Sequence, residues 1–237
     1  MDTSPPRIGL GLTFGRGTPV PGSPLLDFDG RNIDGSNNGT LTDAQLLLLW
    51  KNLGSLGSAA DVGTVSLTAP TYRAVATAGK LNNLPGVQSP GSKIMSSGSV
   101  TLNQPLTWAW VFQNTGSGTQ VVSGGAPSDQ FSTTGDPGLN FYAGSTVDPG
   151  LTYGANTWES LIFTFNGGSS SGTFNGVPFS SGNPGTDGNG SINLFNNFTA
   201  SFGMIGFIAR VLCWGAGAPS QATIAAYLDA IYGANPQ

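Results

Sequence analysis

Residues 156–168 read N-T-W-E-S-L-I-F-T-F-N-G-G, a pattern typical of a buried β-strand that ends in a turn. Leu161, Phe163 and Phe165 alternate with other residues, so they share one face of that strand. Residues 173–177 follow as T-F-N-G-V. Because Asn-Gly adopts the positive φ angles of a type I′ turn, this second pattern predicts a two-residue β-hairpin.

Two further patterns complete the C-terminal third of the chain. Residues 207–214 read F-I-A-R-V-L-C-W and predict a core strand. Ser220 offers a hydroxyl that can cap the free amide groups at the start of a helix, and Gly233 suits the C-cap at its end. Between these two residues, apolar side chains recur at helical spacing and form one stripe. The stripe consists of Ile224, Tyr227, Leu228, Ile231 and Tyr232.

Residues 107–112, T-W-A-W-V-F, predict another strand. Trp108, Trp110 and Phe112 project to one face, because side chains alternate along a strand. Three large rings on one face suit the interior of a β-sandwich better than an aromatic platform for sugars.

In this order, the strand, hairpin, second strand and capped helix resemble the end of a concanavalin A-like lectin/glucanase (LamG-like) domain, of the kind found in tailed-phage virion proteins. Earlier segments resemble other landmarks of that family, although the aromatic partners of these landmarks are partly replaced. The resemblance covers residues 25–233 and implies an all-β fold: a concanavalin A-like jelly-roll β-sandwich with one C-terminal α-helix. The landmark segments are W-K-N-L-G-S-L-G at 50–57, A-P-T-Y-R at 69–73 and L-P-G-V-Q at 84–88.

The chain divides into two parts by composition. Residues 1–24 are rich in Gly and Pro, which weaken regular structure, whereas residues 25–237 form the predicted sandwich domain. Apolar residues nevertheless alternate within the first part, with the period of a strand. This part is a disordered tail, a first edge strand, or an extended N-terminal docking arm that adds a strand to a neighbouring subunit. The alternating residues are Ile8, Leu10, Leu12 and Phe14.

Residues 46–49 are four consecutive leucines, followed by Trp50. A short continuous apolar run has no periodicity that separates a strand from a short helix. Both interpretations stay open at the level of sequence.

The composition of the chain indicates which classes of binding partner to expect. The formal net charge is −4, and only 8% of residues are charged, against about 25% in a typical globular protein. No basic stripe is present to neutralise phosphates, so we expect no nucleic-acid partner. A surface with little charge is poorly defended against association, which favours an assembled protein such as a homo-oligomer.

The remaining sequence signals concern the cellular compartment in which the protein is made. Cys213 lies among apolar residues and is expected to be a buried structural thiol. Glycines interrupt the apolar residues 8–14, so no signal peptide is expected. The apolar run 46–50 is too short to span a bilayer, so we expect no membrane partner. These signals predict a protein made in the host cytoplasm, and the resemblance to domains of tailed-phage virion proteins implies localisation in a virion.

The usual catalytic groups are missing. The chain has no histidine, so a Ser-His-Asp or Cys-His site is excluded. Glucanases of the resembled family carry paired carboxylates in an E-x-D-x-E type motif, but Glu159 is the single glutamate and has no acidic partner two or four residues later. Glycoside hydrolysis needs two carboxyl groups. We therefore expect no enzyme, no catalytic residue and no cofactor.

One segment has a weak calcium pattern. Asp34, Ser36 and Asn38 occupy the first, third and fifth positions of a calcium-loop spacing. Gln45 stands at the twelfth position, where a bidentate glutamate is normally required. Turn chemistry alone also explains Asn and Gly residues in this segment, so the primary expectation is that no metal binds.

A glycan site needs an exposed aromatic ring and side chains that form hydrogen bonds. The Asn-rich segment 193–197 contains the candidates Phe195 and Asn196. The same residues are equally suited to packing or to contacts between subunits.

These observations favour a non-enzymatic structural protein of a tailed-phage virion, anchored by its N-terminal arm to other virion proteins. A head decoration (cement) role is preferred, because no fibrous repeat is present, and a tail or fibre location stays open. The alternative is a carbohydrate-binding adhesion module that recognises a host surface glycan.

Overall fold

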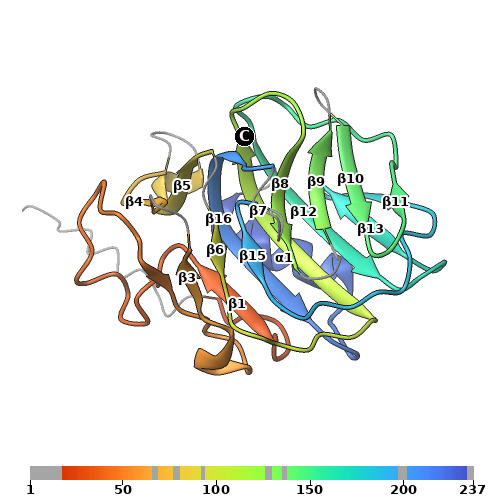
Figure 1. Ribbon diagram of the computed structural model, residues 1–237, viewed down its shortest axis with the longest axis horizontal. Helices are drawn as coiled ribbons and strands as arrows, with labels where there is room; N and C mark the ends of the chain where they lie inside the picture. Colours follow the sequence, from red (N-terminus) through yellow and green to blue (C-terminus); the bar gives the residue numbers. More distant parts are fainter. Residues whose placement is uncertain are drawn as a thin grey trace, which may run out of the picture.

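The computed structural model describes residues 18–65, 69–76, 81–91, 94–125, 130–134, 138–196 and 202–233. In these residues, two antiparallel sheets of eight strands each pack face to face, and one α-helix covers the outer face of one sheet (Figure 1). The fold is a jelly-roll-like β-sandwich with a C-terminal helix, as the sequence resemblance implies.

The first sheet, sheet A, has the strand order β14-β13-β12-β7-β16-β5-β4, and β1 also pairs with β16. Its central strands β12, β7 and β16 are the ones that the sequence patterns predict, although β16 begins two residues earlier than expected. The strands are β1 (Leu26–Asp29), β4 (Thr71–Arg73), β5 (Gly86–Pro90), β7 (Leu106–Asn114), β12 (Trp158–Phe165), β13 (Ser171–Phe174), β14 (Val177–Ser180) and β16 (Ile205–Trp214).

The second sheet, sheet B, has the order β11-β10-β9-β8-β15-β6-β3-β2. Several of its strands are only two residues long. The strands are β2 (Leu49–Trp50), β3 (Val62–Thr64), β6 (Met95–Ser96), β8 (Gln120–Gly124), β9 (Gln130–Thr134), β10 (Gly138–Tyr142), β11 (Thr146–Val147) and β15 (Asn193–Leu194). Two short 3₁₀ helices, η1 (Gly57–Ala60) and η2 (Leu81–Asn83), lie in the connections.

The main core lies between the sheets and is strongly aromatic. Trp108, Trp110 and Phe112 of β7 all belong to it and are buried, which confirms that this aromatic face is core. Trp110 Nε1 donates a hydrogen bond to Ser123 Oγ at 2.8 Å, so its polar atom is satisfied across the sandwich. Phe141 and Phe163 stack with ring centroids 3.9 Å apart, which joins sheet B to sheet A.

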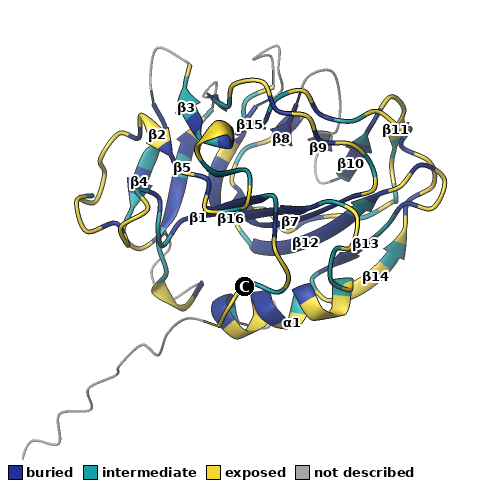
Figure 2. Ribbon diagram, turned by 90° about the horizontal axis from the view of Figure 1, so that it is seen from below, coloured by how far each residue is buried: buried dark blue, intermediate teal, exposed yellow. Residues whose placement is uncertain are grey.

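Helix α1 (Gln221–Tyr232) confirms the predicted amphipathic helix. Ser220 Oγ accepts a hydrogen bond from Thr223 N at 3.1 Å, and Gly233 takes a φ of 89° at the C-cap. The predicted apolar stripe is buried against the outer face of sheet A, where it forms a second core with residues such as Leu212 and Trp214. Figure 2 shows the buried side of α1 facing the sheet.

A buried ionic layer lies where β1, β16 and α1 meet. Arg210 is 1% exposed and donates hydrogen bonds to the carboxylates of Asp27 and Asp29. Its guanidinium carbon also lies 5.9 Å from the ring centroid of Tyr227 in α1. The sequence patterns did not predict this layer.

The first described residues already belong to the body. Trp214 Nε1 donates to Pro21 O at 3.0 Å, and Val20 packs against the second core. Leu25 N then donates to Cys213 O at 2.8 Å, just before β1 begins. Cys213 is buried and outside any disulfide, as expected. The predicted docking residues Ile8, Leu10, Leu12 and Phe14 lie outside the described residues.

The leucine run 46–49 contains no helix. Leu47 points into the core, while Leu46 and Leu48 are exposed, so side chains alternate as in an extended chain. Only Leu49–Trp50 form a strand, because the preceding residues contact both sheets: Leu46 forms a bridge with Thr71 of β4, and Leu48 O accepts from Thr64 N of β3.

None of the helices in the described residues is long and apolar enough to cross a membrane.

Candidate functional site

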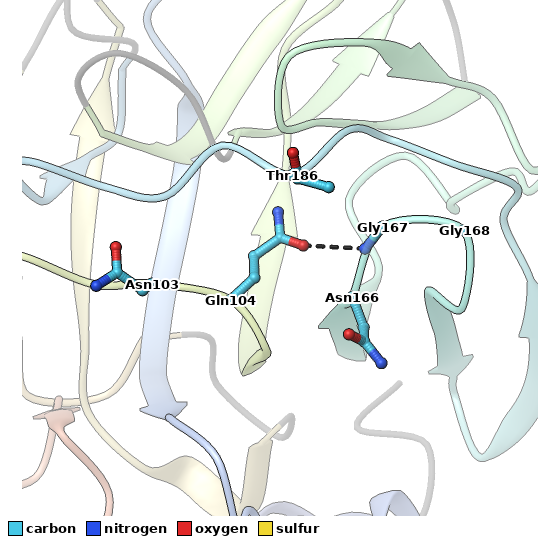
Figure 3. A pocket seen from close by; sticks show the side chains of 6 residues that line it. All are labelled: Asn103, Gln104, Asn166, Gly167, Gly168 and Thr186. Atoms are coloured by element: carbon cyan, nitrogen blue, oxygen red, sulfur yellow. Dashed lines mark hydrogen bonds between the residues drawn. The ribbon is translucent and has the colours of Figure 1, made fainter.

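A pocket of about 500 Å³ opens at one end of the sandwich (Figure 3). We call it the Gln104 pocket. Its lining comes from three segments that are far apart in sequence. The lining residues are Asn103, Gln104, Asn166, Gly167, Gly168 and Thr186.

The sheet topology brings these segments together. Residues 103–104 lead into β7, and residues 166–168 form the turn between β12 and β13. β7 and β12 are antiparallel neighbours in which Leu106 pairs with Phe165, so the start of one strand meets the end of the other. The third segment, which contains Thr186, belongs to the long connection from β14 to β15.

Gln104 holds the three segments in place. Its Nε2 donates to the backbone oxygens of Gly185 at 3.2 Å and Asp187 at 2.9 Å. Its Oε1 accepts from Gly167 N at 3.0 Å, the bond drawn in Figure 3. One side chain therefore links both walls of the pocket, so the pocket geometry is largely set before any ligand arrives.

The connection around Thr186 is also fixed by a close backbone approach. Pro184 O accepts from both Ala143 N and Ser145 N, each at 2.8 Å. Gly185 has a φ of 102°, and a Cβ atom at this position would lie 1.9 Å from Ala143 O. Only glycine fits here. The close approach fixes the backbone next to Thr186, which lines the pocket.

The free polar groups of the pocket are uncharged. Within the part of the chain that the structure describes, the exposed side chains of Asn103, Asn166 and Thr186 make no hydrogen bond to protein. Asparagine offers two donors and an acceptor, and threonine offers a hydroxyl that does both. This set suits a ligand rich in hydroxyl groups. None of the lining residues titrates near neutral pH, so the lining offers no general acid or base.

A second pocket, of about 360 Å³, lies beside Asp43 and Arg73. Arg73 Nε bonds Asp43 Oδ1 at 3.2 Å, and Arg73 Nη1 donates to Gln88 Oε1 at 3.1 Å. These charged groups are already paired with protein. This pocket therefore offers fewer free ligand-binding groups than the Gln104 pocket.

The glycan candidates from sequence are placed differently from expectation. Phe195 is fully buried in the main core, so its ring has no free face for stacking on a sugar. Asn196 is also buried, and its Oδ1 accepts from Phe202 N at 2.9 Å. The structure does not support a sugar site at these two residues, because both take part in packing.

The calcium candidates form a turn. Asp34 Oδ1 accepts from Ser36 N at 2.7 Å and from Asn38 N at 2.9 Å, while its Oδ2 accepts from Thr40 Oγ1 at 3.0 Å. Asn38 Oδ1 in turn accepts from Ile33 N at 2.6 Å. The oxygens proposed as ligands thus hold the turn together. Across the described segments, no group of three or more His, Cys, Asp or Glu side chains could hold a metal ion.

Glu159 also has a role in the fold. Its carboxylate is buried, and it accepts hydrogen bonds from Gly154 N at 2.8 Å and from Asn175 Nδ2. Burial raises the pKa of Glu159, although these two hydrogen bonds oppose the shift. The side chain therefore fastens the Asn175-Gly176 hairpin turn and the 154 loop to β12.

Comparisons with known proteins support the fold. No protein-family model and no curated protein sequence matches the chain. Domain 4 of AbnA, a GH43 extracellular arabinanase from Geobacillus stearothermophilus solved in complex with arabinotriose, has a TM-score of 0.55 and 16% identity over 80% of this chain and 100% of that domain.

Other similar structures are larger chains. A GH54 α-L-arabinofuranosidase has a TM-score of 0.59 and 12% identity over 90% of this chain and 60% of its own. The Botulinum neurotoxin serotype G binding domain has a TM-score of 0.56 and 9% identity over 86% and 50%. At these identities the likeness establishes the fold alone: a β-sandwich of the concanavalin A-like type, which glycoside hydrolase and lectin-like proteins share.

Proposed function

We propose that this chain is a glycan-binding module without catalytic activity, and that the Gln104 pocket is its binding site. The observation that carries the proposal is a preorganised, uncharged pocket whose free groups are two amides and a hydroxyl. A structurally similar domain of an arabinanase was solved with arabinotriose, which supports the same use of this fold.

The chemistry of the lining favours a neutral sugar. No Lys or Arg is among the lining residues, so nothing there would pair with a uronate or a sulfate. The volume of about 500 Å³ lies within the usual range for small-ligand sites.

Two observations support binding without turnover. Glycosidases place two carboxyl groups on either side of the bond that they cleave, whereas the lining contains none. The carboxylate of Glu159, the single glutamate, already accepts hydrogen bonds from Gly154 N and Asn175 Nδ2 within the fold.

A glycan array followed by isothermal titration calorimetry tests this proposal. Asn166→Ala removes an amide that would bond sugar hydroxyls, and each hydrogen bond contributes about 0.5–1.5 kcal/mol, so the Kd for the best neutral glycan should rise roughly twofold to twelvefold. Thr186→Ala should weaken binding in the same way.

The matched control is Thr119→Ala, an exposed threonine beyond the opposite end of β7, which should leave the Kd unchanged. If the triple variant N103A/N166A/T186A binds the glycan as tightly as the parent, the pocket is not the site.

A second candidate function is a structural role in a tailed-phage virion, as a head decoration protein or a tail component. The resemblance to virion domains and the low charge motivate it, and three exposed leucines at one edge of the sandwich, Leu46, Leu48 and Leu49, favour a protein contact. Co-sedimentation with particles stripped of accessory proteins tests it. Saturable binding by the full chain would support this role, and absence of binding would contradict it.

A further inference from the structure

Four large apolar side chains are exposed where residues 46–49 lead into β2 and where Val65 follows β3. The exposed fractions are 58% for Leu46, 75% for Leu48, 46% for Leu49 and 63% for Val65. Thr64 N bonds Leu48 O, so Val65 lies beside the leucine run. We call these four residues the leucine edge.

The leucine edge follows from how the run is anchored. Leu47 and Trp50 are buried in the core, whereas Leu46, Leu48 and Leu49 face outward. β2 is also the last strand of sheet B. Natural proteins usually protect such edges with charged residues or proline. Leucines in this position are typical of a surface that a partner covers.

The N-terminal segment of the same protein has complementary chemistry. Residues 8–14 read I-G-L-G-L-T-F, in which every second residue is apolar and two of the three between them are glycine. In an extended conformation, one face of this segment would be apolar and the other nearly free of side chains. Such a strand can cover an apolar edge without exposing apolar surface of its own.

The path of the chain leaves the leucine edge of the same molecule and that of a neighbour both within reach, because Pro24 O accepts from Ser55 N, five residues after β2. Val20 and Pro21 contact the second core and Trp214, on the α1 side of sheet A. Leu49 of the leucine edge belongs to β2 of the opposite sheet, whereas Leu46 forms a bridge with Thr71 of β4 in sheet A. Residues 1–17, when extended, reach up to about 60 Å, which is enough to span to an adjacent copy.

We propose that residues 8–14 of one copy dock on the leucine edge of a second copy, so that the protein assembles by exchange of its N-terminal segments. The mode is addition of an extended segment to a sheet edge. The proposal does not depend on glycan binding. β2 and β11 end sheet B on opposite sides (Figure 2), and the Gln104 pocket is tied to Ala143 and Ser145 beside β11, so docking leaves the pocket open.

Analytical ultracentrifugation of the full chain and three variants tests the proposal. The full chain should associate, whereas a chain lacking residues 1–17 and the Leu48→Glu variant should sediment as monomers. Val177→Glu is the matched control, because Val177 is 68% exposed on β14, an edge strand of sheet A. It should associate like the parent. Circular dichroism melts check that every variant is folded.

A peptide experiment identifies the segment. A labelled peptide of residues 5–17 should bind the chain that lacks residues 1–17, and Leu48→Glu in that chain should weaken binding roughly tenfold or more. Association that persists in Leu48→Glu, or a full chain that stays monomeric at its highest soluble concentration, would overturn the exchange. Peptide binding combined with a monomeric full chain would mean that the segment covers its own edge.

Discussion

Arg210 Nη2 donates a hydrogen bond to Asp27 Oδ2 at 2.9 Å, although the two residues are separated by 183 positions in the chain. The same guanidinium bonds Asp29, which Arg31 also contacts. Burial raises the pKa of Asp27 to about 6, because the attraction of Arg210 only partly offsets the loss of solvent. Burial also acts to raise the pKa of Asp29, but Arg210 and Arg31 together hold it below its usual value.

The raised pKa of Asp27 predicts a specific pH dependence of stability. The folded state binds the Asp27 proton more tightly than the unfolded state, whose pKa is 3.8, so the free energy of unfolding should rise as pH falls from 7.5 to 5. Asp29 titrates below this window and contributes a constant amount. Urea unfolding at both pH values should show that Asp27→Asn reduces the increase. An identical change in parent and variant would contradict this assignment.

Removing the buried cation of this layer should be far more costly than removing the more exposed one. Arg210→Met would leave two buried carboxylates without their shared partner, which typically costs about 3–5 kcal/mol. The loss should be visible as a lower urea midpoint. Arg31→Met, which removes a more exposed cation from the same layer, serves as the comparison and should cost much less. Equal losses would mean that the buried position of Arg210 has no special effect.

Gln104 should matter for both ligand affinity and stability. Gln104→Ala removes the bonds to Gly167, Gly185 and Asp187, so the two walls of the pocket lose their common link. We expect a fall in stability of about 1–3 kcal/mol, together with a loss of glycan affinity at least as large as that of Asn166→Ala. Calorimetric Kd values and melting temperatures, measured on the same samples, separate the two effects.

Gly185 is predicted to be intolerant of any side chain. Gly185→Ala would force a Cβ atom against Ala143 O and displace the connection that carries Thr186. Gly118→Ala is the matched control, since Gly118 also has a positive φ, 78°, but no atom within 4 Å of the added Cβ. The control should lose only the strain of the left-handed conformation, about 1–2 kcal/mol. If both variants lose the same stability, the close approach is not limiting.

The parts of the fold that the sequence predicts are those with a complete local pattern. The Trp108–Phe112 alternation, the Asn175-Gly176 turn and the Ser220-to-Gly233 helix each specify their own geometry. The two-residue strands of sheet B have no such pattern, because pairing with distant segments creates them. The same holds for the Arg210–Asp27 contact.

The sequence does not predict the candidate site, for a related reason. The Gln104 pocket exists only after β7 and β12 pair and the connection to β15 folds over their ends. The turn at Asn166-Gly167-Gly168 was visible in the sequence, but its partners were not. For Phe195 the sequence-based prediction is wrong, because it placed a core residue at the surface. Its Asn-rich surroundings indicated a surface loop, whereas a positive φ of 67° turns the backbone there and the ring is buried in the core.

The bond from Trp214 Nε1 to Pro21 O has a mechanical consequence. If a molecule is held through its N-terminal segment, tension reaches the body first at Pro21 and then along β1, which pairs with β16 in antiparallel register. Force along β1 loads these hydrogen bonds in shear, several at once. The loops of the Gln104 pocket lie outside that load path. A module tethered in this way would keep its binding geometry while being pulled.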